Sequence, residues 1–428
     1  MASINALILL SLLSGSTAFA QTTTIILDTY QIEAYHGLDS VAQKQLIDKE
    51  LLALRKKGYW LAAVDSVLSI SNKTIFYLFK GRQFEKLDIQ LTSNLSPTEQ
   101  GLLMDLAKSD SPKNLQIEID QTIMGLQSNG YPFAKIKSDS VTIKDGVLLV
   151  SLKVDKGRKI VFDSLTVSSD WISQRFLSNY LKIHSDSHYD QRLIEEIEPK
   201  MSKFEFIKFK GLTTSFGLGK AQVGLDLEQR KVNQFDGILG AVSRQDEGGV
   251  ELTGALTLKV RNLFRSAKSI DIHWEKLRPQ SQELHMRYVH PVLLGSPLDL
   301  SFSFDQIKQD SIFSNRGLSI GLAHDFSASI QLGLAYQNLL GNSLDEQEEE
   351  YGDFEIDATQ LSLKLFFLDD RLNPTKGWRS DFELKVGGKH ALQTNQKSTQ
   401  YSFTTSHAFL QPVAKSFVAA LGLNMGML

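Results

Sequence analysis

The chain has 428 residues, a formal net charge of −3, a sequence pI near 6.3 and no cysteine. The length suits about two to four domains. The charge gives no sign of a nucleic-acid partner, which usually shows as a basic patch or a high pI. The missing cysteine excludes a disulfide framework, a cysteine-ligated zinc ion, a thiol nucleophile and a lipid-anchored N-terminal cysteine.

Residues 1–20 have the pattern of a secretory signal peptide. Residues 6–13 are mostly apolar, and residues 18–20 read Ala-Phe-Ala, a small-x-small cleavage site. The segment before the apolar core has no Lys or Arg, so a buried N-terminal helix is the alternative. No other stretch approaches the ~20 apolar residues of a membrane helix. We therefore expect an exported chain that can enter a membrane only as a closed barrel.

The first half contains a repeat. Two apolar stripes at i, i+4 and i+7 are each followed by a Gly-Tyr pair, at Gly58 and Gly130. This pattern predicts amphipathic helices that end at a glycine. The stripes are Ile47, Leu51 and Leu54, and then Ile119, Ile123 and Leu126.

Two strands follow each predicted helix, and a Lys-Gly-Arg sequence, with Gly81 or Gly157, then leads into the next unit. The unit of strand, helices, strand and strand spans about 75 residues, which suits a string of small domains. A weaker third copy has Ile197, Met201 and Phe204 at helical spacing, with a proline inside and no Gly-Tyr after it. Chance similarity of two α+β segments is the alternative. The predicted domains are 21–81, 82–156 and 157–232.

This order of elements and the recurring Lys-Gly-Arg resemble POTRA domains, the periplasmic modules of outer-membrane assembly proteins. The resemblance implies that the modules bind client chains or partners by adding a strand to an exposed sheet edge. An unpaired edge offers backbone donors and acceptors to any extended peptide.

From about residue 233 onward the apolar pattern has a period of two, which is typical of strands with one apolar face. We predict eleven strands, near 234–243, 250–260, 267–276, 283–290, 297–305, 317–325, 330–338, 357–367, 378–386, 399–410 and 415–425.

The connections after odd-numbered strands read as longer and more polar than those after even-numbered strands, as in an outer-membrane barrel. A soluble sandwich or soluble barrel is the alternative. The predicted fold is therefore α+β POTRA-like repeats followed by an antiparallel transmembrane β-barrel over residues 233–428.

The sequence FFLDDRLNPTKGW, residues 366–378, connects the eighth and ninth strands. Asn-Pro favours a turn, Gly377 permits a positive φ, and Trp378 can lie at a membrane interface. A well-formed hairpin explains these residues. The segment also resembles a turn of BamA/TamA-like barrels, and that resemblance points to Asp370, Asn373, Pro374, Thr375, Gly377 and Trp378.

The segment at 232–241 resembles the first barrel strand of the same family. The resemblance implies a seam, which pairs weakly with the last strand, at Phe235, Asp236, Gly237 and Gly240. The family's Arg-Gly-aromatic loop and aromatic-terminated last strand do not occur. We expect a C-terminally truncated barrel with about eleven of sixteen strands; a degenerate barrel of ten or twelve strands is the alternative.

No catalytic, cofactor or metal site is predicted, because no nucleophile elbow, P-loop or dinucleotide motif occurs. His184 and His188 lie in a Ser/Asp-rich linker, and the acidic run 345–350 lacks the glycine of a calcium loop. Three histidines fall in predicted strands without a partner spacing: His273, His285 and His290.

The resemblance implies insertion of outer-membrane proteins or export of polypeptides, without nucleotide and without enzymatic chemistry. Expected partners are unfolded outer-membrane or secreted clients, outer-membrane lipids and accessory periplasmic or lipoprotein subunits. The alternatives are a two-partner-type transporter of one dedicated client, which would have two periplasmic modules, and a barrel enzyme or porin with docking domains.

Overall fold

The computed structural model describes residues 22–27, 30–35, 40–70, 73–97, 99–243, 250–278, 280–344, 352–371, 373–414 and 417–427. The predicted signal peptide and the acidic run 345–350 lie outside these residues. The chain divides into an N-terminal unit, residues 1–160 with 188–191, and a C-terminal unit, residues 161–187 with 192–428.

The N-terminal unit contains two α+β modules. In the first, the sheet order is β2-β1-β4-β3, and the core includes Leu54, Phe76 and Leu78. Its elements are β1 (Thr22–Leu27), β2 (Tyr30–Tyr35), α1 (Ser40–Lys56), β3 (Ala63–Ile70) and β4 (Lys73–Phe79).

The second module has the sheet order β5-β7-β6, and Leu106, Leu115 and Leu148 are fully buried in its core. Its elements are β5 (Leu87–Ser93), η1 (Gln100–Leu103), α2 (Met104–Ala107), α3 (Pro112–Gln127), β6 (Lys135–Lys144) and β7 (Val147–Asp155). Ile119 and Leu126 of the predicted stripe are buried, and Ile123 packs against the same core.

A third small sheet, in the order β8-β10-β9, opens the C-terminal unit. Its elements are β8 (Val161–Val167), α4 (Gln174–Leu181), α5 (Gln191–Glu195), α6 (Ile197–Met201), β9 (Ile207–Gly217) and β10 (Lys220–Gln229). The single helix expected over Ile197, Met201 and Phe204 is wrong: α6 ends at Met201, and Phe204 lies in the following loop. All three side chains are buried, so the apolar spacing predicted core residues correctly but not the length of the helix.

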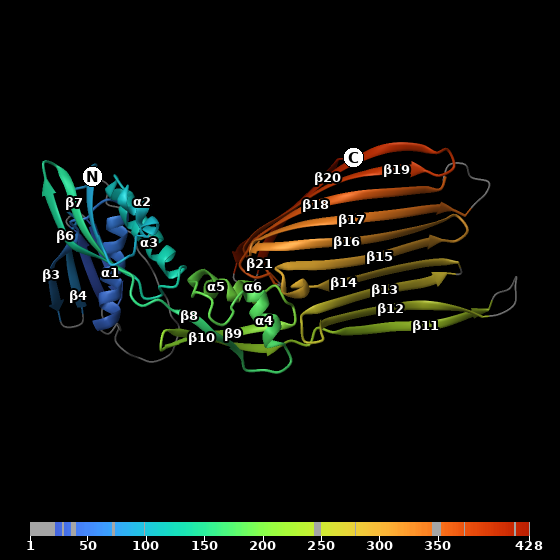
Figure 1. The fold of residues 1–428 in the computed structure, drawn as a ribbon, viewed down its shortest axis with the longest axis horizontal. Coiled ribbons are helices and arrows are strands. Elements are labelled where there is room, and N and C mark those ends of the chain that lie inside the picture. The colour runs from blue at the N-terminus through green and yellow to red at the C-terminus, as the bar shows by residue number, and fades with distance from the viewer. Residues whose placement is uncertain are drawn as a thin grey trace. The chain divides into compact units, whose positions relative to one another are not determined.

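The rest of the unit is one antiparallel sheet in which every strand pairs with its sequence neighbours (Figure 1). Its strands are β11 (Gln234–Ser243), β12 (Val250–Leu263), β13 (Lys268–Arg278), β14 (Ser281–His290), β15 (Leu298–Gln309), β16 (Phe313–Ser327), β17 (Ile330–Ser343), β18 (Phe354–Leu368), β19 (Gly377–Ala391), β20 (Gln396–Ala414) and β21 (Phe417–Met427), with η2 (Leu293–Gly295) between β14 and β15.

This order confirms the predicted fold class and the eleven strands. The predicted asymmetry of the connections is wrong. β15 ends at Gln309 and β16 begins at Phe313, so most of the expected loop at 306–316 is strand. Polar side chains there do not interrupt a ladder that is held by backbone hydrogen bonds.

Candidate functional site

The large sheet has one apolar and one polar face, because successive side chains of a strand point to opposite sides. One row of directly opposite residues crosses from β15 to β21 and is apolar throughout: Leu300, Leu322, Leu334, Leu361, Leu384, Phe403 and Met427. From Leu322 onward each of these side chains is at least 40% exposed. The adjacent row on the other face includes Gln360, Lys385 and Ser402.

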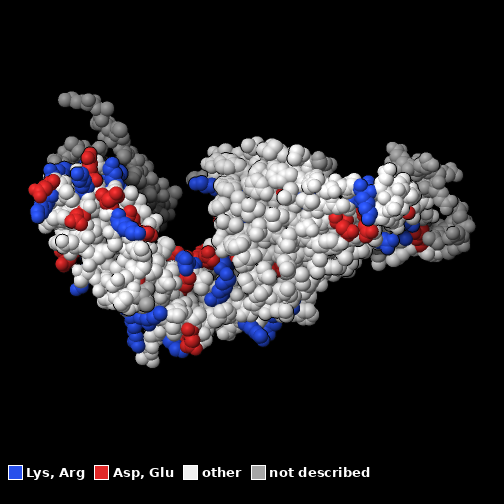
Figure 2. Space-filling view, turned by 45° about the horizontal axis from the view of Figure 1, so that its top comes forward, with Lys and Arg blue, Asp and Glu red and all other residues white. Residues whose placement is uncertain are grey.

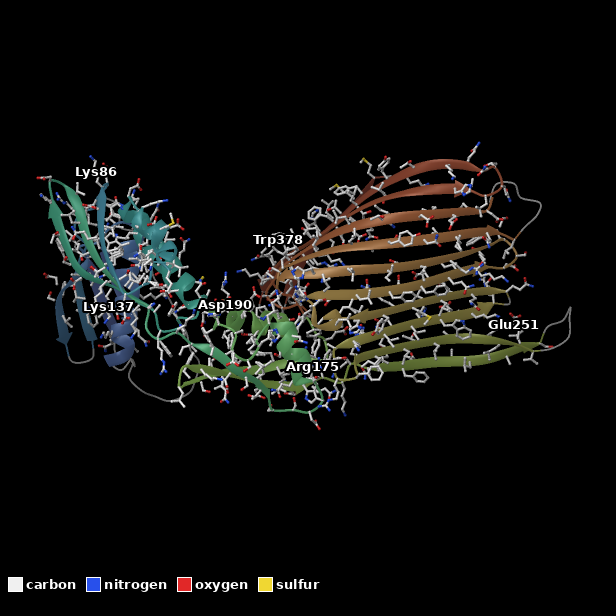
Figure 3. All side chains as sticks on the ribbon, viewed as in Figure 1. Lys86, Lys137, Arg175, Asp190, Glu251 and Trp378 are labelled. Carbon is white, nitrogen blue, oxygen red and sulfur yellow. The ribbon has the colours of Figure 1, made fainter. Side chains whose placement is uncertain are left out.

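An exposed apolar surface of this extent needs a lipid or protein cover. Figure 2 shows a broad stretch of the sheet with few charged side chains, and charges gathered toward its ends. Trp378 and Glu251 lie at opposite ends of the sheet (Figure 3). The polar face encloses a cavity of about 440 Å³ whose lining includes Arg287, Lys364 and Glu383.

The turn between β18 and β19 is organised by Asp369, which the sequence reasoning missed. Its Oδ1 accepts hydrogen bonds from the backbone N–H groups of Thr375 and Lys376, both at 2.9 Å, and the Thr375 hydroxyl donates to Oδ2. These hydrogen bonds hold the pKa of the Asp369 carboxyl well below its usual range, and the bond from the Thr375 hydroxyl has the largest effect. Asp370, the predicted residue, accepts the N–H of Asn373 at 2.9 Å. Either of two adjacent aspartates suits such a turn, so the sequence could not choose between them.

Glycine is required where this turn enters β19. Gly377 has a φ of +117°, and a Cβ there would lie 2.0 Å from the carbonyl oxygen of Phe367. Trp378 follows on the apolar face, 38% exposed, with its ring centroid 4.6 Å from that of Phe367. Pro374 lies between Asn373 and Thr375 in the same turn.

Arg371 of this turn ties it to the neighbouring hairpin, a role without a signal in the sequence. Its guanidinium donates to the carbonyl oxygen of Ala328 and lies over the ring of Phe366, 4.3 Å from the centroid. Burial lowers the pKa of Arg371. The β16–β17 and β18–β19 turns are therefore joined at one end of the sheet.

The third small module contacts the same end of the sheet through Lys203. Its Nζ donates to Asp299 Oδ2 of β15 at 2.9 Å and to Asp325 Oδ2 of β16 at 2.5 Å. Burial alone would lower the pKa of Lys203, but the surrounding negative charge outweighs it and raises that pKa. Gln331 donates to the other oxygen of Asp325 at 2.7 Å. Lys203 alone, among the residues that line the polar cavity, comes from outside the sheet.

The predicted seam residues lie on β11, an edge of the sheet that pairs with β12 alone among the described strands. Phe235 and Gly237 fall on the apolar face and Asp236 and Gly240 on the polar face, since Asp236 is opposite Thr257. Every residue of β11 is exposed, and Phe235 is 74% exposed. The four residues thus lie together on an edge strand of the described sheet, and their role in a seam stays a prediction.

The four predicted module glycines have positive φ values, at Gly58, Gly81, Gly130 and Gly157. Gly58 and Gly130 lie just after α1 and α3. Tyr131, after Gly130, donates to Glu99, and Lys156 donates to the same carboxylate at 2.7 Å. These hydrogen bonds hold the pKa of Glu99 well below its usual range, and the bond from Lys156 has the largest effect.

His184 and His188 lie in the irregular segment between α4 and α5, so the helical spacing considered for a metal does not arise. Within the described ranges, no helix is long and apolar enough to cross a membrane.

Residues 262–428 match the Omp85 superfamily domain. No curated protein matches the chain. Its fold is similar to that of CdiB from Acinetobacter baumannii, with a TM-score of 0.50 and 12% identity over 90% of this chain and 75% of that one. BamA from Haemophilus ducreyi lacking POTRA domains 1–3 gives a TM-score of 0.41 and 14% identity over 80% of this chain and 71% of that one. POTRA3–5 of Haemophilus influenzae BamA gives a TM-score of 0.33 and 14% identity over 50% of this chain and 99% of that one.

Proposed function

We propose that this chain, whose residues 262–428 match the Omp85 superfamily domain, inserts or translocates polypeptides by pairing their strands with edge strands of its own sheets. The apolar face of the large sheet lies in the outer membrane, and the small α+β modules lie in the periplasm. The turns that contact the third module are therefore at the periplasmic end.

The observation that carries the proposal is the edge strand β11. Among the described strands it forms its ladder with β12, and its residues are exposed. Its side away from β12 carries N–H and C=O groups that must pair with a strand in lipid, where an unsatisfied group costs several kcal/mol. An incoming strand satisfies those groups, so the edge favours client strands over lipid.

The small sheets offer further edges for capture before insertion. β6 and β9 are edge strands of the second and third modules, and most of their side chains are not buried. An extended client can add to such an edge by main-chain bonds without a fixed sequence. The clients would be unfolded outer-membrane or secreted polypeptides, and accessory periplasmic or lipoprotein subunits would dock on the same modules.

The second candidate is secretion of one dedicated client, as in two-partner secretion. The fold similarity to CdiB favours it. The three small sheets in the described part of the chain favour the first reading, because the secretion reading predicts two periplasmic modules. Both functions are physical processes that break no covalent bond, so we propose no catalytic residue.

A pair of proline substitutions tests the edge. Successive amides of a strand point to opposite sides. One of the two substitutions, Ile238→Pro or Leu239→Pro, therefore removes an N–H donor to β12, and the other removes an N–H donor that points away from β12. We expect the variant that loses the outward donor to lower client insertion into liposomes while β11–β12 hydrogen exchange stays protected. The other variant loosens the hairpin and serves as the matched control. Normal client insertion by both variants would contradict the pairing of client strands with β11.

A further inference from the structure

The strands β13 and β14 carry a block of four metal-ligand side chains on the polar face of the sheet. His273 is directly opposite His285, and Glu275 is directly opposite Glu283. Two carboxylates that face each other across a strand pair repel and destabilise that pair. A cation between them would reverse this cost.

The imidazoles and carboxylates of the block approach each other in pairs. Nε2 of His285 lies 3.5 Å from Glu283 Oε1, and Nε2 of His273 lies 3.8 Å from Glu275 Oε2. The two imidazole rings are nearly parallel, at 16°, with centroids 6.4 Å apart. Both histidines line a cavity of about 340 Å³, so an ion can reach them from solvent.

The other nitrogen of each ring has its own partner. His285 Nδ1 is 2.8 Å from Asp305 Oδ1 on β15, and His273 Nδ1 is 3.1 Å from Thr257 Oγ1 on β12. A ligating histidine almost always gives its second nitrogen to a carboxylate, carbonyl or water, which fixes the ring and raises its basicity. These anchors leave Nε2 of both rings for a metal. Lys259 and Arg287 line the same cavity, and Asp271 lies directly opposite both and pairs with Arg261 at 2.9 Å.

We propose that His273, His285, Glu275 and Glu283 bind one zinc ion that clips β13 to β14. Zinc takes histidine nitrogen and carboxylate oxygen in four-coordinate sites. In the described part of the chain no three His, Asp or Glu side chains are already arranged to hold a metal. The site therefore closes by rotation of the Glu275 and Glu283 side chains and by tilting of the two imidazoles about their Nδ1 bonds, for which these four side chains, 39–45% exposed, have room. This inference does not depend on the proposed function.

The test uses the full chain without a polyhistidine tag, in detergent micelles, stripped with a chelator and titrated with Zn²⁺ against a chromophoric competitor. We expect one zinc ion to bind per chain. The zinc affinity should fall at least ~100-fold in His273→Gln and in His285→Gln. Asp305→Asn, which removes the anchor of His285, should weaken binding roughly 10–100-fold. X-ray absorption of the wild-type complex should show nitrogen and oxygen ligands at about 2.0–2.1 Å.

His390→Gln is the matched control, because His390 is a strand histidine of another hairpin with its own partner, Asn395, at 2.8 Å. Its zinc affinity should equal that of the wild type. Binding that persists in a folded His273→Gln/His285→Gln variant, or a wild-type spectrum without histidine ligands, overturns the proposal.

Discussion

Replacement of Lys203 by methionine should loosen the third module from the large sheet. The change leaves Asp299 and Asp325, whose side chains are 16% and 18% exposed, without their shared cation. Removal of one partner from a buried ion pair costs about 3–5 kcal/mol. Partial exposure puts this site near the lower end, at about 3 kcal/mol, which corresponds to ~100-fold faster opening.

The assay is hydrogen–deuterium exchange of residues 197–229 in micelles, compared between variants at one pH. Lys210→Met is the control: Lys210 pairs with Glu228 at 2.8 Å, but the two side chains are 43% and 51% exposed. An exposed pair contributes ~1 kcal/mol or less, so this variant should exchange less than about fivefold faster.

A double-mutant cycle separates pairing from packing. In an Asp299→Asn/Asp325→Asn background the carboxylates are neutral, so Lys203→Met should cost much less than in the wild type. Equal effects of Lys203→Met and Lys210→Met, or an equal cost of Lys203→Met in both backgrounds, would refute the reasoning.

Two further predictions concern the turn and the second module. Gly377→Ala should destabilise the β18–β19 hairpin by about 1–3 kcal/mol or more, because its Cβ would meet the Phe367 carbonyl oxygen at 2.0 Å; a loss of heat stability in gel-shift unfolding checks this, and an unchanged transition would contradict it. The lowered pKa of Glu99 means that its bonds to Lys156 and Tyr131 stabilise the fold above the unfolded pKa of about 4.3, and this stability is lost as pH falls toward the folded pKa. The free energy of unfolding in urea, measured between pH 6 and 3, should therefore depend less on pH in Glu99→Gln than in the wild type. An identical pH dependence in both would show that Glu99 does not contribute this stability.

The sequence predicted the type and number of the barrel strands because period-two alternation is a local property. It missed their ends, as in β16, where polar residues at 314 and 316 continue the ladder beyond the apolar rows. Backbone hydrogen bonds extend a hairpin without regard to side-chain polarity.

Contacts between distant segments could not be predicted. Lys203 meets residues 96 and 122 positions away, and no periodicity reports such a pairing. The histidines at 273 and 285 were placed in strands, but their alignment depends on the register of β13 and β14. Asp369 was missed because its neighbour Asp370 has the same side chain and an equally suitable position.

The central claim is that clients pair with the free edge of β11. A photo-crosslinking amino acid at Phe235, which is 74% exposed on β11, tests it during insertion of an unfolded outer-membrane polypeptide. The control is the same probe at Phe302, a 39% exposed residue on the apolar face of the interior strand β15. The account predicts client adducts at residue 235 and background labelling at residue 302. Equal labelling at both positions, or active insertion without adducts at residue 235, would contradict it.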